Sequence, residues 1–163
     1  GHMVQSFAKK LSGFEAQVIE FDKYTERSFG SIATRVTLQE IYDTAHIVSL
    51  HLPLSEETNE YANATFFHSF KKPIVFMNTS RGGHVNATDL MNALDAGIVS
   101  HAALDVLPFE KYSLEGLNEN HLFDKLLTYP SVLITPHVAG WTNESYFKLS
   151  HVLFEKIKGH YAL

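Results

Sequence analysis

Short apolar runs alternate with longer segments of helical spacing along the 163 residues of this chain. The runs are rich in Val, Ile, Leu and Phe, and most are nearly continuously apolar, which is typical of strands buried on both faces of a parallel sheet. The strands predicted in this way span residues 16–21, 33–36 (the weakest), 46–52, 73–78, 98–104 and 131–135. Because strands that alternate with helices form βαβ units, the pattern predicts an α/β fold built on a doubly wound parallel sheet.

Capping residues mark where several helices should begin and end. Thr37 followed by Glu40 predicts a capping box, in which the hydroxyl and the carboxylate each bind a free backbone N–H. Asn86 is placed to cap a later helix, which Gly97 is expected to end. Gly13 is expected to end a helix that opens the chain.

The last predicted helix begins at Thr142, and its large side chains recur at helical intervals. Phe147, Phe154, Ile157 and Tyr161 fall on one face of it. Such a face is typical of core or interface residues, so we expect it to be packed.

Composition narrows the classes of protein that the chain can represent. The 13 Lys and Arg against 18 Asp and Glu give a formal net charge of -5, and no basic run is interleaved with aromatic residues, so we expect no nucleic-acid partner. No apolar run approaches the length of about 18 residues that a membrane span needs, so we expect no membrane association. Zero cysteines fit a reducing compartment, and we expect the cytoplasm.

The chain is long enough for one domain with its own core. Gly1, His2 and Met3 look like the remnant of a cleaved expression tag, so we expect the domain to occupy residues 4–163. The ten histidines lack metal-ligand spacing such as His-Glu-x-x-His, and we therefore expect no metal site.

Two charged side chains follow predicted strands at places where ligands bind in α/β sheets. Asp22 follows the first predicted strand, where an acidic residue can accept hydrogen bonds from the adenosine ribose of a dinucleotide; the alternative is a solvated loop aspartate. Arg81 follows the strand at 73–78 and is flanked by small residues, so it is placed to meet an anionic group. A structural arginine paired with a nearby carboxylate is the alternative for Arg81.

Three further candidates follow the last two predicted strands. Asp105 and Glu110 come just after the strand at 98–104, and His137 follows the last strand. Because histidine titrates near neutral pH, it can act as an acid or base on a hydroxyl or carbonyl group. Arginine, glutamate and histidine at three strand ends could converge on one crevice.

Taken together and in order, these stretches resemble the cofactor-binding domain of the D-isomer-specific 2-hydroxyacid dehydrogenases. The stretches that match are Val-Ser-Leu-His-Leu-Pro-Leu at 48–54 with Glu57 and Thr58, Asn-Thr-Ser-Arg-Gly-Gly at 78–83, Ala-Ala-Leu-Asp-Val at 102–106 with Glu110, and Thr-Pro-His-Val-Ala-Gly at 135–140. They follow the family's order and approximate spacing over about residues 14–145. A collinear set of this kind is far more specific than any one of its parts.

The resemblance implies a function for the catalytic candidates. Arg81 would bind the carboxylate and carbonyl of the substrate, His137 would be the general acid and base, and Glu110 would pair with His137. The reaction would be hydride transfer between NAD and a small D-2-hydroxyacid or 2-oxoacid, of which 3-phosphoglycerate is one candidate. The alternative is a regulator of the same fold that binds NAD(H) or a partner without catalysis.

The resemblance also implies that NAD is the cofactor. Asp22 would bind the adenosine ribose and favour NAD over NADP, and Asp105 would lie near the nicotinamide carboxamide. The residues that the resemblance assigns to cofactor binding are Asp22, His51, Pro53, Thr79, Asp105 and Gly140.

Three departures from the family pattern shape the remaining expectations. The family's first strand with its Gly-x-Gly-x-x-Gly turn and its substrate domain are missing, and Lys111 stands where a proline often follows the catalytic glutamate. The missing strand would lie between residues 16–21 and 46–52, so we expect a divided sheet. Its open edges predict a homodimer or a higher assembly, and the alternative is that the N-terminal segment rearranges into the gap. We also expect this chain to be inactive alone and to bind NAD poorly, since backbone N–H groups that hold the pyrophosphate are gone.

Overall fold

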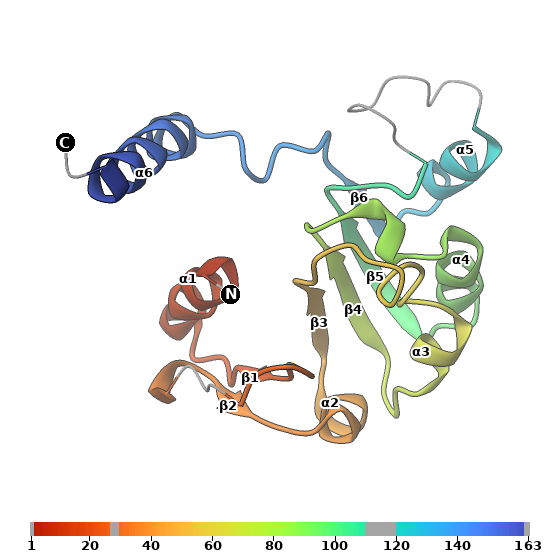
Figure 1. Ribbon diagram of the computed structural model, residues 1–163. Helices are drawn as coiled ribbons and strands as arrows, with labels where there is room; N and C mark the ends of the chain where they lie inside the picture. The colour runs from red at the N-terminus through yellow and green to blue at the C-terminus, as the bar shows by residue number, and fades with distance from the viewer. Residues whose placement is uncertain (1, 27–29, 110–119, 162–163) are drawn as a thin grey trace.

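The computed structural model describes residues 2–26, 30–109 and 120–161, and these residues form two separate parallel sheets (Figure 1). In the smaller sheet, β1 (Ile19–Glu20) pairs with β2 (Thr34–Arg35). In the larger sheet the order is β3 (Ile47–Leu50), β4 (Ile74–Asn78), β5 (Val99–Leu104) and β6 (Val132–Ile134). All six predicted strands are confirmed, and each is within the range that the sequence predicted.

The sheet is divided between β1 and β3, where the sequence predicts a missing strand. The two sheets are not hydrogen-bonded to each other in the described part of the chain. Within each sheet the strands are parallel and every neighbouring pair is joined by a crossover, as the βαβ pattern requires. The chain therefore holds the two flanks of a doubly wound sheet.

Helices connect the strands, with three short 3-10 turns among them. The helices are α1 (His2–Leu11), α2 (Leu38–Thr44), α3 (Ala64–His68), α4 (Ala87–Asp95), α5 (His121–Leu127) and α6 (Asn143–Tyr161), and the turns are η1 (Ser12–Phe14), η2 (Gly30–Ile32) and η3 (Gly82–His84). In Figure 1, α3, α4 and α5 lie together on one side of the larger sheet and α1 lies on the other.

Most of the predicted caps are present. At the start of α2 the Thr37 side chain accepts from the Glu40 amide, and the Glu40 carboxylate accepts from the Thr37 amide, which completes the capping box. Asn86 caps α4, and Gly97 follows that helix with a φ of 69°. The expected stop at Gly13 is wrong, because η1 continues through this glycine and Glu15 takes the left-handed conformation instead, with a φ of 54°.

The core lies between the larger sheet and helices α2 to α5. Phe66, Phe67 and Phe70 of the α3 region surround Phe76 of β4, and neighbouring rings meet edge to face. On the opposite face of the sheet Ile47 and Leu133 are each 64% exposed. The expectation that the strands are buried on both faces is therefore wrong for the described residues, because α2 to α5 cover only one face.

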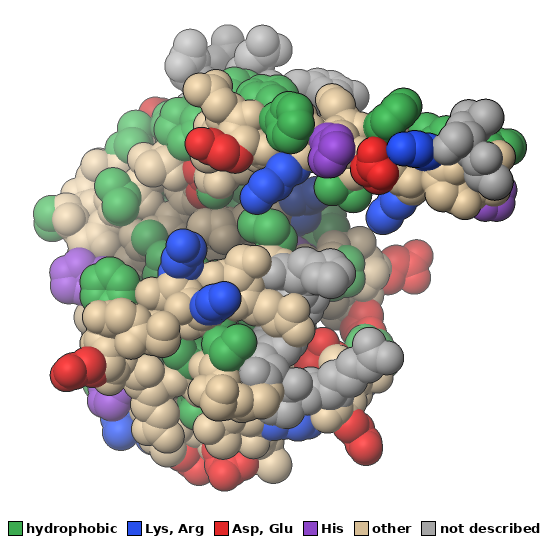
Figure 2. All heavy atoms as spheres, turned by 90° about the vertical axis from the view of Figure 1, so that its left-hand side faces the viewer, with side chains coloured by type: hydrophobic (Ala, Val, Ile, Leu, Met, Phe, Trp, Pro, Cys, Tyr) green, Lys and Arg blue, Asp and Glu red, His purple; other side chains and the backbone are tan. Residues whose placement is uncertain are grey.

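The apolar face of α6 is not packed against the rest of the described chain. Phe147, Phe154, Ile157 and Tyr161 are all exposed, so they do not form part of a core within the described chain, and a place for them in an interface stays a prediction. Figure 2 shows the helix extending away from the body of the molecule with hydrophobic side chains on its open surface. Within the described residues, no helix is both long enough and apolar enough to cross a membrane.

Candidate active site

The predicted site residues gather at one edge of the structure, beyond the carboxyl ends of the parallel strands. Ligands of open α/β sheets bind at this edge. Asp22 follows β1, His51 and Pro53 follow β3, Thr79 and Arg81 follow β4, Asp105 follows β5, and His137 and Gly140 follow β6. Glu110 lies outside the described residues, so its predicted pairing with His137 stays a prediction.

Buried polar side chains mark the same edge. In the described ranges, Asn78, His84 and Asp105 are the polar or charged side chains that are buried, and each is at the carboxyl end of β4 or β5 or in the turn that follows β4. Buried polar groups need hydrogen-bond partners, and the partners of Asn78 and Asp105 are backbone groups and hydroxyls of the loops that carry the site residues.

Arg81 is held by a network centred on Asn78. The Asn78 amide nitrogen donates to the Arg81 carbonyl at 2.9 Å, and the Asn78 carbonyl oxygen accepts from the backbone N–H of Ser80 at 3.1 Å. The guanidinium itself is exposed, with Nη1 donating to the Ser80 carbonyl at 2.6 Å. Among the described residues Arg81 forms no ion pair with a carboxylate. The loop thus presents an exposed guanidinium whose other N–H groups are available to an anion.

Gly82 brings the Arg81 loop against the loop that follows β5. A Cβ atom at this position would lie 2.0 Å from the carbonyl oxygen of Leu107 and 2.7 Å from the nitrogen of Pro108. Both neighbours are backbone atoms, so they cannot turn aside as a flexible side chain would. Only glycine fits at this contact between the two loops.

Asp105 joins the β5 loop to the loop that carries His137. Its Oδ1 accepts from the Thr135 hydroxyl at 2.5 Å and from the Val138 N–H at 2.9 Å, and its Oδ2 accepts from the Ala139 N–H at 3.0 Å. The carboxylate is 5% exposed. The sequence indicated a role beside the nicotinamide and missed this structural one, since bonds to backbone amides 33 and 34 residues away leave no sequence pattern.

His137 occupies a left-handed backbone conformation with a φ of 55°. A residue other than glycine adopts this conformation at a cost of about 1–2 kcal/mol, which the bonds from Asp105 to the next two residues help to offset. Because β5 lies between β4 and β6, the strands that lead to Arg81 and His137 are two strand spacings apart, about 10 Å.

Asp22 is fixed at the end of β1 by its own turn. Its Oδ1 accepts from the N–H groups of Tyr24 and Thr25, at 2.9 and 3.2 Å. Lys23 and Tyr24 both bind the carboxylate of Glu57, which connects this loop to the loop after β3. The hydrogen bond from Lys23 lowers the pKa of Glu57, and the pKa of Lys23 is raised in turn. The Lys23 ammonium is thereby engaged with Glu57, and the Arg35 guanidinium donates from Nη2 to the Asp22 carbonyl at 2.9 Å.

His51 lies beside the first helix. Its Nε2 is 3.0 Å from the Ser49 hydroxyl, and its ring centroid is 5.7 Å from that of Phe7. Burial lowers the pKa of His51, so the imidazole is neutral at physiological pH. Pro53, two residues on, is exposed, and its carbonyl accepts from the Thr58 hydroxyl at 2.7 Å.

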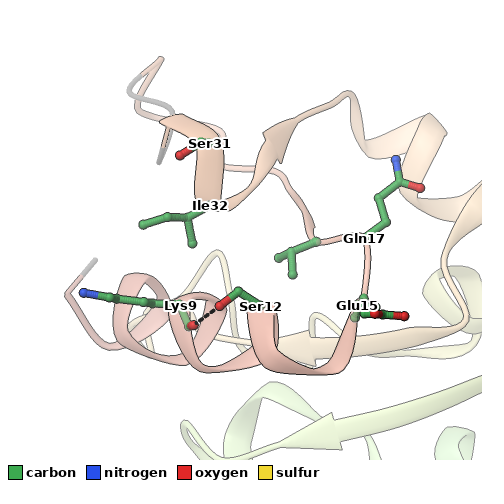
Figure 3. A pocket seen from close by; sticks show the side chains of 8 residues that line it. Lys9, Ser12, Glu15, Gln17, Ser31 and Ile32 are labelled. Carbon is green, nitrogen blue, oxygen red and sulfur yellow. Dashed lines mark hydrogen bonds between the residues drawn. The ribbon is translucent and has the colours of Figure 1, made fainter.

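A cavity of about 620 Å³ lies elsewhere, between the end of α1 and η1 with Lys9 and Ser12 on one side and η2 with Ser31 and Ile32 on the other (Figure 3). Its walls come from the end of α1, from η1 and from the residues that precede β1 and β2, including Lys9, Glu15 and Ile32. It is therefore at the amino ends of the strands, away from the predicted site. In the described part of the chain, no three His, Asp or Glu side chains are grouped as a metal site would need.

Comparison with known proteins identifies the chain. The family described as D-isomer specific 2-hydroxyacid dehydrogenase, NAD binding domain, matches residues 1–139. The chain belongs to this family. The matched range begins at the first residue and so includes the three residues interpreted above as a tag remnant.

Relatives and solved structures agree with this assignment. A D-lactate dehydrogenase of Streptococcus pyogenes serotype M1 is 34% identical over 151 residues, which cover 89% of this chain and 46% of the relative. A D-isomer specific 2-hydroxyacid dehydrogenase from Lactobacillus delbrueckii ssp. bulgaricus, solved in its NAD complexed form, is 28% identical with a TM-score of 0.85 over 97% of this chain and 51% of that one. D-3-phosphoglycerate dehydrogenase 2, chloroplastic, from Arabidopsis thaliana is 31% identical over 98% of this chain and 24% of the relative. The chain spans about half the length of the D-lactate dehydrogenases that it matches.

NAD is the cofactor of this family, and the residues at the strand ends fit its two nucleoside halves. The carboxylate of Asp22 is held by its own turn after β1, and Thr79, Asp105 and Gly140 follow β4, β5 and β6 at the edge where α/β sheets bind ligands. No Gly-x-Gly-x-x-Gly turn, the usual backbone cradle of a dinucleotide's pyrophosphate, occurs among these 163 residues.

Proposed function

We propose that this chain is the cofactor-binding portion of a longer NAD-dependent dehydrogenase that interconverts a D-2-hydroxyacid and the corresponding 2-oxoacid. The observation that carries the proposal is the linkage of the Arg81 loop to the His137 loop through Asn78 and Asp105. An anion-binding guanidinium and an acid/base imidazole at neighbouring strand ends suit a substrate whose carboxylate adjoins a carbonyl.

In the proposed mechanism Arg81 binds the substrate carboxylate and orients the carbonyl. His137 gives a proton to the carbonyl oxygen during reduction and removes it from the hydroxyl during oxidation, with Glu110 as its partner. Bound NADH supplies the hydride. Arg81 also stabilises the charge that develops on the oxygen in the transition state.

On the cofactor side, Asp22 binds the ribose hydroxyls and repels a 2′-phosphate. The loop with His51 and Pro53 passes beside the cofactor, and Thr79 and Gly140 contact it from the loops after β4 and β6. Replacing Asp22 with serine in the complete enzyme should weaken NADH binding and improve NADPH binding relative to it. An unchanged cofactor preference would refute the assignment.

Steady-state kinetics of the complete enzyme test the catalytic proposal. The panel of substrates should include pyruvate and the 2-oxoacid of 3-phosphoglycerate, because relatives include D-lactate dehydrogenases and a D-3-phosphoglycerate dehydrogenase. His137→Ala should remove most turnover while NADH still binds, and Arg81→Ala should mainly raise the KM for the 2-oxoacid. Normal turnover in the His137 variant would end this proposal.

A regulator that binds NAD(H) without catalysis is the second candidate function. NADH binding by the complete protein, with no turnover on any 2-oxoacid of the panel, would favour it. Retention of Arg81, Glu110 and His137 favours the enzyme.

For this chain by itself we propose no catalytic activity, weak NADH binding and a homodimer in the cytoplasm. The support for a dimer is the pair of sheet edges at β1 and β3, which have no strand between them in the part of the chain that the structure describes. Sedimentation at micromolar concentration together with an NADH titration tests these points. A stable monomer that binds NADH tightly would refute them.

A further inference from the structure

His84 is a buried histidine that the proposed mechanism does not use. It ends the η3 turn, three residues after Arg81, and its side chain is fully shielded from solvent. Its Nδ1 is 3.0 Å from the Ser80 hydroxyl, whereas its Nε2 has no hydrogen-bond partner within the described residues. A buried imidazole with a hydrogen-bond partner for only one of its two nitrogens lowers the stability of the fold. Its presence therefore needs an explanation, such as a role in positioning a neighbouring group.

Ser80 connects His84 to the network that holds Arg81. The Ser80 hydroxyl also lies 2.9 Å from the Asn78 side-chain carbonyl, which accepts from the Ser80 N–H as well. The Asn78 side chain in turn donates to the Arg81 carbonyl. A chain of hydrogen bonds therefore runs from His84 through Ser80 and Asn78 to the backbone of Arg81.

The backbone around His84 is tied to the neighbouring loop. The Ala62 N–H donates to the His84 carbonyl at 2.8 Å, and the Glu60 N–H donates to the Gly83 carbonyl at 2.7 Å. The imidazole is thus anchored in the body of the domain on one side. On its other side it meets the loop that carries the guanidinium.

Resting on the proposed function, we propose that His84 is a positioning residue that fixes the Arg81 loop through Ser80 and so sets the affinity for the 2-oxoacid carboxylate. The Arg81 guanidinium donates from Nη1 to the Ser80 carbonyl at 2.6 Å, so its position depends on the backbone of this loop. Loss of the contact between His84 and Ser80 lets Ser80 and Asn78 turn to other partners, and the loop loosens.

Two substitutions at His84 separate this role from simple packing. Asparagine places a polar atom close to the position of Nδ1, whereas glutamine reaches toward the position of Nε2 and cannot replace the contact with Ser80. Asparagine is the smaller side chain, so a role in packing alone makes His84→Asn the more harmful change. The proposal gives the opposite order, with His84→Gln the more harmful.

The first measurement is amide hydrogen exchange at positions 80 and 84 in the 163-residue chain, followed by NMR. His84→Gln and Ser80→Ala should each raise these exchange rates about tenfold, and the double variant should exchange no faster than Ser80→Ala, because both changes break one contact. His84→Asn should stay within about twofold of the unchanged chain. Equal exchange in the Asn and Gln variants, or faster exchange with Asn, would overturn the proposal.

The second measurement is kinetic and uses the complete enzyme. His84→Gln should raise the KM for the 2-oxoacid about tenfold and leave the KM for NADH within about twofold, with His84→Asn close to the unchanged enzyme. A 2-oxoacid KM that does not respond to His84→Gln would refute the role in substrate affinity. An unchanged enzyme that reduces no 2-oxoacid would instead refute the proposed function, and the exchange rates would still decide whether His84 fixes the loop.

Discussion

Replacing Gly82 with alanine should be among the most damaging single methyl additions to this protein. The new Cβ would lie 2.0 Å from the Leu107 carbonyl oxygen and 2.2 Å from its carbon, and real Cβ contacts essentially never fall below 3.0 Å. At least 1.0 Å of separation must therefore open between two backbone segments. One segment is held by Asn78 and the other by the bond from the Asp105 N–H to the Asn78 carbonyl.

The loss of unfolding free energy in Gly82→Ala can be estimated from the known cost of overpacking. Overpacking a core costs about 1–3 kcal/mol, and here backbone rather than a side chain must move, so we expect a loss of about 3 kcal/mol or more. With a urea dependence of about 2 kcal/mol per M, the unfolding midpoint should fall by about 1.5 M. Arg81 should also be displaced from the His137 loop, which predicts weaker 2-oxoacid binding in the complete enzyme.

The neighbouring glycine provides a matched control. A Cβ at Gly83 would lie 3.2 Å from the end of the Leu54 side chain, which is 51% exposed and free to turn. Gly83→Ala should therefore change the free energy of unfolding by no more than about 0.5 kcal/mol. Urea unfolding of both variants, followed by circular dichroism, compares them. Equal midpoints for Gly82→Ala and Gly83→Ala would refute the reasoning.

Three further predictions concern the caps and buried groups. Asp105→Ala should destabilise the chain by about 2–3 kcal/mol, because three donors of the β6–α6 loop lose their acceptor, and urea unfolding should detect it. Thr37→Ala should cost about 1 kcal/mol by removing the N-cap of α2, whereas no change in the unfolding midpoint would argue against the capping box. Burial lowers the pKa of His84 from 6.5, so the unfolded chain binds the proton more readily and stability should fall as pH drops below this value. His84→Asn should flatten that part of the pH profile, and an identical profile would contradict the assignment.

The sequence by itself determined the strands, several caps and the loops where the chemistry lies. The βαβ alternation and the capping box at Thr37 and Glu40 depend on residues within a few positions of each other, so their signals are local. Placement of Arg81 and His137 at strand ends followed from the same local pattern, because loops after parallel strands share one edge. The family resemblance rested on these stretches and on their order.

Only the tertiary structure decided how the loops are held together. In the sequence Gly82 is only one of two glycines beside Arg81. The structure shows that a side chain is excluded there by the backbone of Leu107, which is distant in the chain. Asp105 binds amides more than 30 residues away, and no spacing rule predicts such a pairing.

Which apolar faces of the domain are covered was also decided by the tertiary structure. The apolar runs predicted strands covered on both faces, and the periodic apolar face of α6 predicted packing. In the described chain Leu133 and Phe154 are both exposed. Hydrophobic periodicity shows which face of an element avoids water, but whether that face is covered depends on which other segments are present to bury it.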